Sequence, residues 1–298
     1  MVTLRQLEYL VMVADLASFT RAAETLHVTQ PALSHQIRAL EKEVGASLLE
    51  RRPRGTQPTA AGRAMLAHAR SALGEAETAV QTARQAAGLI AGELRVATVY
   101  SITLGVLPPA LTIWSRRHPA VDLRLFEHRH AQELADSVAD GQADLAVGPE
   151  PQGWRGPTET LGTEDFVVAV SVDDPLAAVA SRKVELNALA DRRWVHFAPD
   201  HGLASVLDRA CEQAGFQPRI AVRTEQTASA PILAAAGLGP ALVPANLISD
   251  SYNGVLLTPV PAVRRLLVAY TRNRFDALSS AFIDVLKETA PLELRPMP

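Results

Sequence analysis

Apolar residues near the start of the chain recur every three or four positions, which predicts a series of short amphipathic helices. The first helix covers about residues 4–16, and the second opens at Ser18, a good N-cap. The third covers residues 30–43, with Thr29 as its cap and Pro31 in its first turn, where a missing N–H costs little. A tight turn separates the second helix from the third, so the two form a helical hairpin.

The third predicted helix has one apolar stripe and one polar face. Its stripe consists of Leu33, Ile37 and Leu40. The opposite face carries hydrogen-bonding groups and one cation, namely Gln30, Ser34, His35 and Arg38. Such groups suit base edges and phosphates, which favours a helix that enters the major groove of double-stranded DNA. Helical hairpins with a polar face also occur in domains that bind no nucleic acid, so periodicity alone leaves both interpretations open.

The segment after these helices, residues 48–59, predicts a small β wing. It contains an apolar pair, a Pro/Gly turn and three cations, Arg51, Arg52 and Arg54. Three helices followed by a wing form a winged helix-turn-helix, an architecture of DNA-binding domains.

A run of motifs across the same region resembles the N-terminal domain of the LysR-type transcriptional regulators. The motifs read SFT, RAAE, LHVTQPALS, QIRALE, LLER and T-x-A-G. The resemblance implies DNA binding, with Gln30, Ser34 and His35 at base edges and Arg38 at phosphate. The whole set implied to bind DNA is Thr29, Gln30, Pro31, Ser34, His35, Arg38, Arg51, Arg52 and Arg54. His35 and Leu49 depart from the Arg and Phe that the family often has there.

One long alanine-rich helix is predicted next, over about residues 59–88, with Thr59 as a plausible N-cap. Its apolar stripe is formed by Leu66, Ala69, Leu73, Ala76 and Val80. This stripe needs a partner, either a second copy of the helix or another part of the same chain. The family resemblance favours the second copy, and implies a homodimer or homotetramer that reads a two-fold related operator.

The pattern changes after Gly88 and Gly92 to alternating strands and helices, which predicts an α/β region with parallel sheets. The first unit has strands at 94–99, 121–126 and 145–147 and helices at 101–117 and 132–140. The second has strands at 194–197, 220–222 and 241–244 and helices at 203–214 and 228–236. Strands at 166–172 and 266–271 cross between the two units, and a last helix at 277–289 is expected to pack on the first.

This organisation resembles the two-lobed periplasmic-binding-protein fold, which is also the effector domain of the same regulator family. The segment AAAGLGPALVP at 234–244 resembles a segment of that domain. The expected fold class is therefore α/β, with an N-terminal winged helix-turn-helix joined to the two lobes by a linker helix. The expected domains are 1–58 for DNA binding, 59–90 for the linker and dimerisation helix, and 91–298 for the effector. Lobe I would cover 91–163 and 266–298, and lobe II 164–265.

Ligands of open α/β sheets bind beyond the carboxyl ends of the strands, near helix N-termini. Matching the family's contacts to these places makes Ser101, His130 and His201 the leading effector-binding candidates. Thr103, Gly148 and Gln226 come second. Hydroxyl groups beside helix N-termini suit an anion, which favours a small carboxylate as the effector. A Ser or Thr that begins a helix is also a common cap without any ligand.

Charge and composition narrow the function further. The net charge is −3, yet residues 1–70 hold nine basic and six acidic side chains, so the basic excess lies with the proposed DNA-binding region. The single cysteine, Cys211, allows no intrachain disulfide and suggests a reducing, cytoplasmic setting. No long apolar run predicts a membrane span, and the start of the chain lacks a secretion signal.

The chain shows no nucleophile elbow, phosphate-binding loop or dinucleotide-binding motif, so we expect no enzyme and no cofactor. His128 and His130 lack a third ligand, so no metal site is expected. The expected partners are double-stranded DNA, a small-molecule effector and a second copy of the chain; RNA polymerase could be a further partner. Two alternatives stay open: a regulator whose lobes only oligomerise, and a solute-binding or enzymatic α/β protein.

Overall fold

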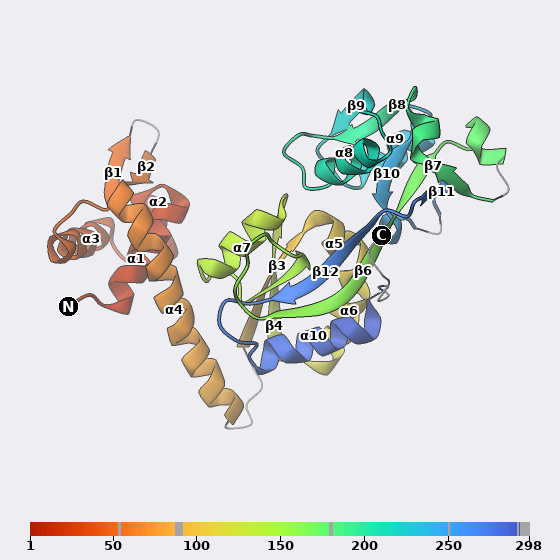
Figure 1. The fold of residues 1–298 in the computed structure, drawn as a ribbon. Helices are drawn as coiled ribbons and strands as arrows, with labels where there is room; N and C mark the ends of the chain where they lie inside the picture. Colours follow the sequence, from red (N-terminus) through yellow and green to blue (C-terminus); the bar gives the residue numbers. More distant parts are fainter. Residues whose placement is uncertain (53–54, 87–91, 179–180, 250, 291, 293–298) are drawn as a thin grey trace. The chain divides into compact units, whose positions relative to one another are not determined.

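The computed structural model describes residues 1–52, 55–86, 92–178, 181–249, 251–290 and 292 (Figure 1). The chain divides into two compact units, the first formed by residues 1–93 with 136–143 and the second by 94–135 with 144–298.

The first unit begins with three helices and a two-stranded sheet. Their bounds are α1 Leu4–Leu16, α2 Phe19–Thr25, α3 Gln30–Val44, β1 Leu49–Arg52 and β2 Gly55–Pro58. Each helix begins at a hydroxyl side chain that accepts a backbone N–H from its first turn, because Thr3, Ser18 and Thr29 cap α1, α2 and α3. Helix α3 ends at Gly45, whose positive φ of 75° suits glycine.

The apolar stripes of α1, α2 and α3 meet in one core. Leu10, Val13, Leu33 and Leu40 are completely buried there. Full burial of such a side chain contributes about 1.5–3 kcal/mol, so this core is the main support of the helical hairpin. The sequence-based bounds of these helices are confirmed within two residues.

The wing is a two-stranded hairpin that a backbone hydrogen bond ties to the helices. Strands β1 and β2 pair antiparallel, with Leu49 opposite Pro58. The backbone N–H of Thr56 donates to the carbonyl of Ala17 at 2.9 Å, which fastens β2 to the segment between α1 and α2. The predicted wing is thereby confirmed as a hairpin.

The linker helix α4 spans Ala60–Ala86 and begins after Thr59, whose hydroxyl accepts the N–H of Gly62 at 3.0 Å. Leu66 and Ala69 of its predicted stripe are buried, and α4 contacts α1 of the same chain. Farther along, Val80 is 51% exposed. The stripe therefore has two parts: its first half packs on its own chain, and its second half presents an apolar side chain to solvent.

The second unit is built on a mixed eight-stranded sheet in the order β4-β3-β5-β12-β6-β11-β7, with β10 also paired to β6. Strands β3 and β5 are parallel, whereas β12 runs antiparallel to both β5 and β6. A separate parallel pair, β8 and β9, completes the strands. Their bounds are β3 Gly92–Val99, β4 Val121–His128, β5 Leu145–Pro149, β6 Thr158–Val170, β7 Lys183–Glu185, β8 Arg193–Phe197, β9 Arg219–Thr224, β10 Ala241–Pro244, β11 Val255–Val260 and β12 Arg264–Tyr270.

Helices flank these strands. Their bounds are α5 Tyr100–Gly105, α6 Leu107–Arg117, α7 Ala131–Ala139, α8 Ala204–Gln213, α9 Ser229–Ala235 and α10 Ala277–Thr289, with short 3-10 helices η1 Pro175–Ala178, η2 Leu186–Leu189 and η3 Ala245–Leu247. We call β3, β4 and β5 with their helices the first lobe, and β8, β9 and β10 with theirs the second lobe. Figure 1 shows β6 running as one strand from the first lobe into the second.

Two expectations for this unit need correction. The single helix expected at 101–117 is two helices, α5 and α6, because Pro108 and Pro109 have no N–H to continue the ladder and instead occupy the first turn of a new helix. The crossover strand expected to begin at Phe166 begins at Thr158, so it is long enough to belong to both lobes.

Each lobe has its own aromatic core. Trp194 and Phe197 are buried in the second lobe. In the first, Trp114 of α6 meets Phe282 of α10 edge-on, with ring centroids 5.2 Å apart. The last helix therefore packs on the first lobe, as the sequence predicts.

Candidate DNA-binding surface and ligand cavity

The polar face of α3 is held in place by its own hydrogen bonds. Nε2 of Gln30 donates to Oγ of Ser34 at 2.9 Å, and Nε of Arg38 donates to the carbonyl oxygen of Ser34 at 3.2 Å. His35 and Arg38 are exposed, as are Thr29 and Pro31, while Gln30 and Ser34 are half-buried. The helix thus presents amide, hydroxyl and imidazole groups on one side, with a cation one turn later.

A cavity of about 440 Å³ lies between this face and the wing. It is lined by four of the predicted DNA-binding residues, Gln30, Pro31, Ser34 and Arg38, together with Phe19, Ile37, Glu41, Leu49, Glu50 and Thr56. The structure therefore brings these four residues together beside the hairpin.

The cations of the wing are less fully described. Arg51 and Arg52 belong to β1, and Arg54 lies outside the described residues.

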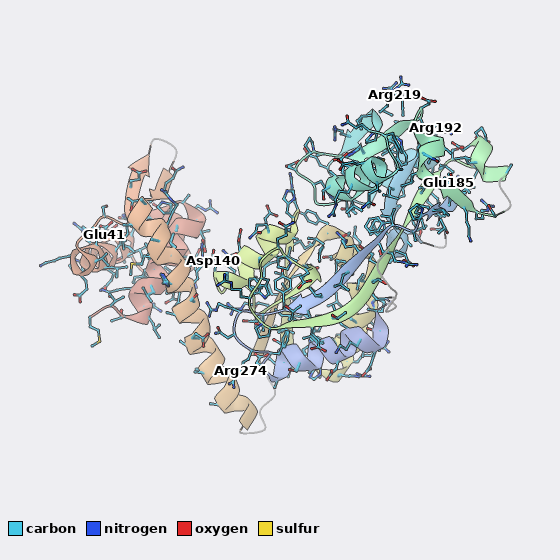
Figure 2. All side chains as sticks on the ribbon, in the orientation of Figure 1. Glu41, Asp140, Glu185, Arg192, Arg219 and Arg274 are labelled. Atoms are coloured by element: carbon cyan, nitrogen blue, oxygen red, sulfur yellow. The ribbon has the colours of Figure 1, made fainter. Side chains whose placement is uncertain are left out.

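Glu41 of α3, labelled in Figure 2, accepts hydrogen bonds from the start of the wing, which fixes the hairpin to the third helix.

A second cavity of about 440 Å³ lies between the two lobes of the second unit. It is lined by Val99, Tyr100, Ser101, His128, Arg129, His130, Ala131, Gln132, Pro149, Glu150, Pro151, Gln152, His201, Gly202, Leu203, Ser205, Val206, Arg209 and Arg265. All three leading effector-binding candidates contribute to this one cavity, although Ser101 belongs to α5 and His130 and His201 to two separate loops.

His201 is buried on the second-lobe side of the cavity. Its Nδ1 accepts the backbone N–H of Leu203 at 3.1 Å, so Nε2 carries the proton and donates to Oγ1 of Thr227 at 3.1 Å. Burial is the main cause that lowers the pKa of His201 to about 4, with smaller contributions from the neighbouring His130 and Arg129, against which Asp200 acts. At neutral pH the ring is therefore an uncharged hydrogen-bond donor.

Arg129 connects the two lobes at the edge of the cavity. Its guanidinium pairs with Asp200 at 3.0 Å and Glu225 at 3.7 Å, and its carbonyl accepts the N–H of Gly202 at 3.0 Å. A Cβ at Gly202 would lie 2.7 Å from that carbonyl oxygen, so only glycine allows this close approach.

Arg265 and Arg209 add two further cations to the lining, which holds one glutamate, Glu150. Sequence reasoning missed both arginines. The dipeptide Arg264-Arg265 at the start of an otherwise apolar strand was an available signal, because a buried strand rarely begins with two cations. Thr227, which fixes His201, was also missed as a site residue, although it lies just after a strand, beside the candidate Gln226.

The three secondary candidates lie elsewhere. Gln226 lines a neighbouring cavity with Tyr100 and Arg129. A Cβ at Gly148 would lie 2.8 Å from Cδ2 of Leu134, so a larger residue there would displace the Leu134 side chain. The Thr103 hydroxyl is buried, with no hydrogen-bond partner among the described residues.

Metal-binding and membrane-spanning features are both missing from the described part of the chain. There, no cluster of three or more His, Cys, Asp or Glu side chains could hold a metal ion. Over the same residues, no helix combines the length and the apolar character needed to cross a bilayer.

Two family models together match nearly the whole chain. The model described as "LysR substrate binding domain" matches residues 87–291, and that described as "Bacterial regulatory helix-turn-helix protein, lysR family" matches residues 4–63. The transcriptional regulator AlsR of Bacillus subtilis is 30% identical over 288 residues, covering 95% of this chain and 94% of AlsR.

Solved structures agree with this fold. A full-length OxyR variant from Pseudomonas aeruginosa superposes with a TM-score of 0.82 at 23% identity, covering 100% of this chain and 99% of that one. Full-length CbnR in complex with its target DNA has a TM-score of 0.55 at 25% identity, covering 96% of this chain and 99% of CbnR. With a helix-turn-helix and a two-lobed ligand-binding region both matched, the chain belongs to the LysR family of DNA-binding transcriptional regulators.

Proposed function

We propose that this regulator binds a two-fold related DNA site as a homodimer, and that a small anion in the cavity between its lobes controls that binding. A small carboxylate is the favoured anion. The observation that carries the proposal is the meeting of Ser101, His130, His201 and Arg265 at one cavity.

The DNA-binding part of the proposal rests on the polar face of α3. Gln30, Ser34 and His35 would meet base edges in the major groove, whereas Arg38 would meet a phosphate. Thr29 and Pro31 begin the same helix and would bring its N-terminus close to the backbone. The three wing arginines, Arg51, Arg52 and Arg54, would follow the backbone or enter the minor groove.

The anion-binding part of the proposal rests on the charged side chains that line the cavity. Arg209 has no ion-pair partner among the described residues, and Glu150 is the one carboxylate among the lining residues. Arg129 and Arg265 also line the cavity, and their carboxylate partners Asp200, Glu225 and Glu164 lie outside the lining. Thr103, Gly148 and Gln226 stay secondary candidates for contact with a larger ligand.

The dimerisation part of the proposal rests on α4. Val80 presents apolar surface at the end of a stripe whose first half is already occupied. A second copy of the helix would cover it, and would place two copies of α3 in successive grooves. The domain boundaries expected from the sequence, a cytoplasmic location and a contact with RNA polymerase accompany this role as predictions.

A ligand screen tests the anion proposal. Purified full-length protein is heated with malonate, succinate, citrate or benzoate at constant ionic strength, with chloride as the control. A binding ligand at 100 times its Kd stabilises the protein by about 2.7 kcal/mol, which raises Tm measurably. If no anion in the panel raises Tm above the chloride control, the interpretation that the lobes serve only oligomerisation is favoured instead.

A further inference from the structure

Arg265 and Glu164 face each other across the two strands that join the lobes. Glu164 lies on β6 and Arg265 on β12, and the register of the antiparallel pair places them directly opposite. Oε2 of Glu164 accepts Nε of Arg265 at 2.9 Å and also accepts its Nη2, so two guanidinium nitrogens share one carboxylate oxygen.

Glu164 is enclosed on its other side as well. Its side chain is 1% exposed, and its Oε1 accepts Nδ2 of Asn246 at 3.1 Å. A buried carboxylate left without a partner would be very costly, so the positive charge of Arg265 is needed beside Glu164. Asn246 lies in η3, directly after β10, so the carboxylate contacts a third segment at the junction of the lobes.

The other side of the guanidinium faces the cavity. Nη2 of Arg265 also donates to Oγ of Ser101 at 3.1 Å, and Arg265 itself lines the cavity. Its Nη1 has no hydrogen-bond partner within the described parts of the chain. One nitrogen of a guanidinium that is already fixed in position is therefore left for a ligand.

We propose that Arg265 binds the negative charge of the effector through Nη1, and that Glu164 is a positioning residue that competes for the same cation. This inference rests on the proposed function, because it assigns the charge contact and its regulation within the same cavity. Glu164 holds the guanidinium in the orientation that an anion needs, and its own negative charge repels that anion. The pair thereby sets the anion affinity below the value that an isolated arginine would give.

The location of the pair links the ligand to the junction of the lobes. An anion on Arg265 shares a guanidinium with the carboxylate that contacts Asn246, so occupancy of the cavity changes the electrostatic balance at β6, β12 and η3 together. A ligand shifts a conformational equilibrium only through contacts that differ between its states. The Glu164–Arg265 pair supplies such a contact.

The variant Glu164→Gln separates competition with the ligand from a purely structural role of the ion pair. Glu164→Gln removes the charge and keeps the shape, and Oδ1 of Asn246, which has no partner among the described residues, can accept a hydrogen bond from the introduced amide once Asn246 rotates. If Arg265 only fastened β6 to β12, E164Q would weaken ligand binding or leave it unchanged. If Glu164 competes with the ligand, E164Q tightens it.

Isothermal titration of the full-length protein with malonate, and separately with sulfate, measures the effect at constant ionic strength. For E164Q we expect a Kd lower by about tenfold, because the variant lacks a negative charge that repels the anion from several ångströms away. For R265Q we expect a Kd higher by at least about tenfold, since a charge-assisted hydrogen bond is lost. The matched control is D165N, one position along β6, whose partner Arg264 lies outside the cavity lining; its Kd should stay within about twofold of wild type.

The outcomes separate the two proposals. Anion binding by wild type with an unchanged or higher Kd for E164Q overturns this inference and leaves the proposed function standing. Failure of wild type to bind either probe or any carboxylate of the panel overturns both. If R265Q does not fold, because Glu164 is left buried without its cation, E164Q and the double variant E164Q/R265Q decide the matter. The double variant should not show the lower Kd that E164Q shows, because the cation that binds the anion is absent.

Discussion

The carboxylate of Glu41, near the end of α3, accepts the backbone N–H of Leu48 at 2.8 Å and so fixes the start of the wing to the third helix. The same oxygen also accepts the N–H of Leu49 at 3.3 Å and the hydroxyl of Ser47 at 3.1 Å. Because Leu48 is fully buried, water cannot replace the lost acceptor easily.

Glu41→Ala should therefore destabilise the DNA-binding unit by about 1–3 kcal/mol, the cost of leaving a buried N–H unsatisfied. Urea unfolding followed by circular dichroism measures this. Glu41→Gln keeps one acceptor oxygen, so its free energy of unfolding should fall by less than that of E41A. Equal midpoints for wild type and E41A would show that the wing does not depend on this contact.

The neutral state of His201 predicts a pH dependence of stability. Its pKa is lowered to about 4 by burial first, whereas in the unfolded chain it is about 6.5. Between these values the unfolded chain binds a proton that the folded chain does not, so the free energy of unfolding falls as pH decreases from 6.5 to 4. At most about 3 kcal/mol is lost over this window, and nothing changes above pH 6.5.

His201→Gln isolates this effect from the carboxylates that titrate over the same range. The difference in unfolding free energy between wild type and H201Q should shift by up to about 3 kcal/mol in favour of the variant as the pH falls from 6.5 to 4. Parallel pH profiles for the two proteins would mean that folding does not lower the pKa of His201.

Cys211 should be chemically inert in the folded protein. Burial first, and the charge of Asp208 second, raise the pKa of its thiol to about 12. Since the thiolate is the reactive species, labelling by a disulfide reagent at pH 8 should follow unfolding rather than precede it. Stoichiometric labelling of the native protein within minutes would contradict this account of the second-lobe core.

The exposed end of the α4 stripe predicts a variant with altered assembly. Val80→Glu places a charge where we propose that a second copy packs, so light scattering should report a lower mass than for wild type at the same concentration. His68→Glu, an exposed position of the same helix outside the stripe, is the matched control. An unchanged mass for V80E would place the dimer contact elsewhere.

Sequence patterns located the helices of the first unit well because each begins at a capping side chain such as Ser18 or Thr29 and has a clear apolar stripe. They located the cavity only in part. Ser101, His130 and His201 follow strands along the chain, which a rule about strand ends can find. Arg265 enters from β12, paired through long-range register with Glu164 about 100 positions earlier, and no local pattern reveals such a partner.

The same limit explains the missed strands. Strand β7 has three residues, and β11 contains Pro259, so neither shows a strand pattern that stands out from a loop. Both are strands because they pair with each other, and β11 also with β6, a property of the assembled sheet. The long strand β6 was underestimated for a related reason, since charged residues, Glu159, Glu164 and Asp165, interrupt the apolar pattern of its first half.

Arg38 provides a contrast to the base-reading residues. Its loss should weaken binding to all DNA sequences about equally and reduce the slope of log affinity against log salt by about one, because one phosphate contact disappears. Fluorescence anisotropy at several salt concentrations measures both quantities for Arg38→Ala. A change of sequence preference, with the salt slope unaltered, would instead place Arg38 at a base edge.

The central claim is that the polar face of α3 selects DNA sequence, and selection from a random duplex library tests it most directly. Wild type should enrich a two-fold related motif. The double variant Ser34→Ala with His35→Ala should stay folded, keep its salt-dependent non-specific affinity, and enrich a relaxed motif or none. Enrichment of the same motif by both proteins, with equal preference at every position, would contradict the assignment of α3 as the helix that reads the bases.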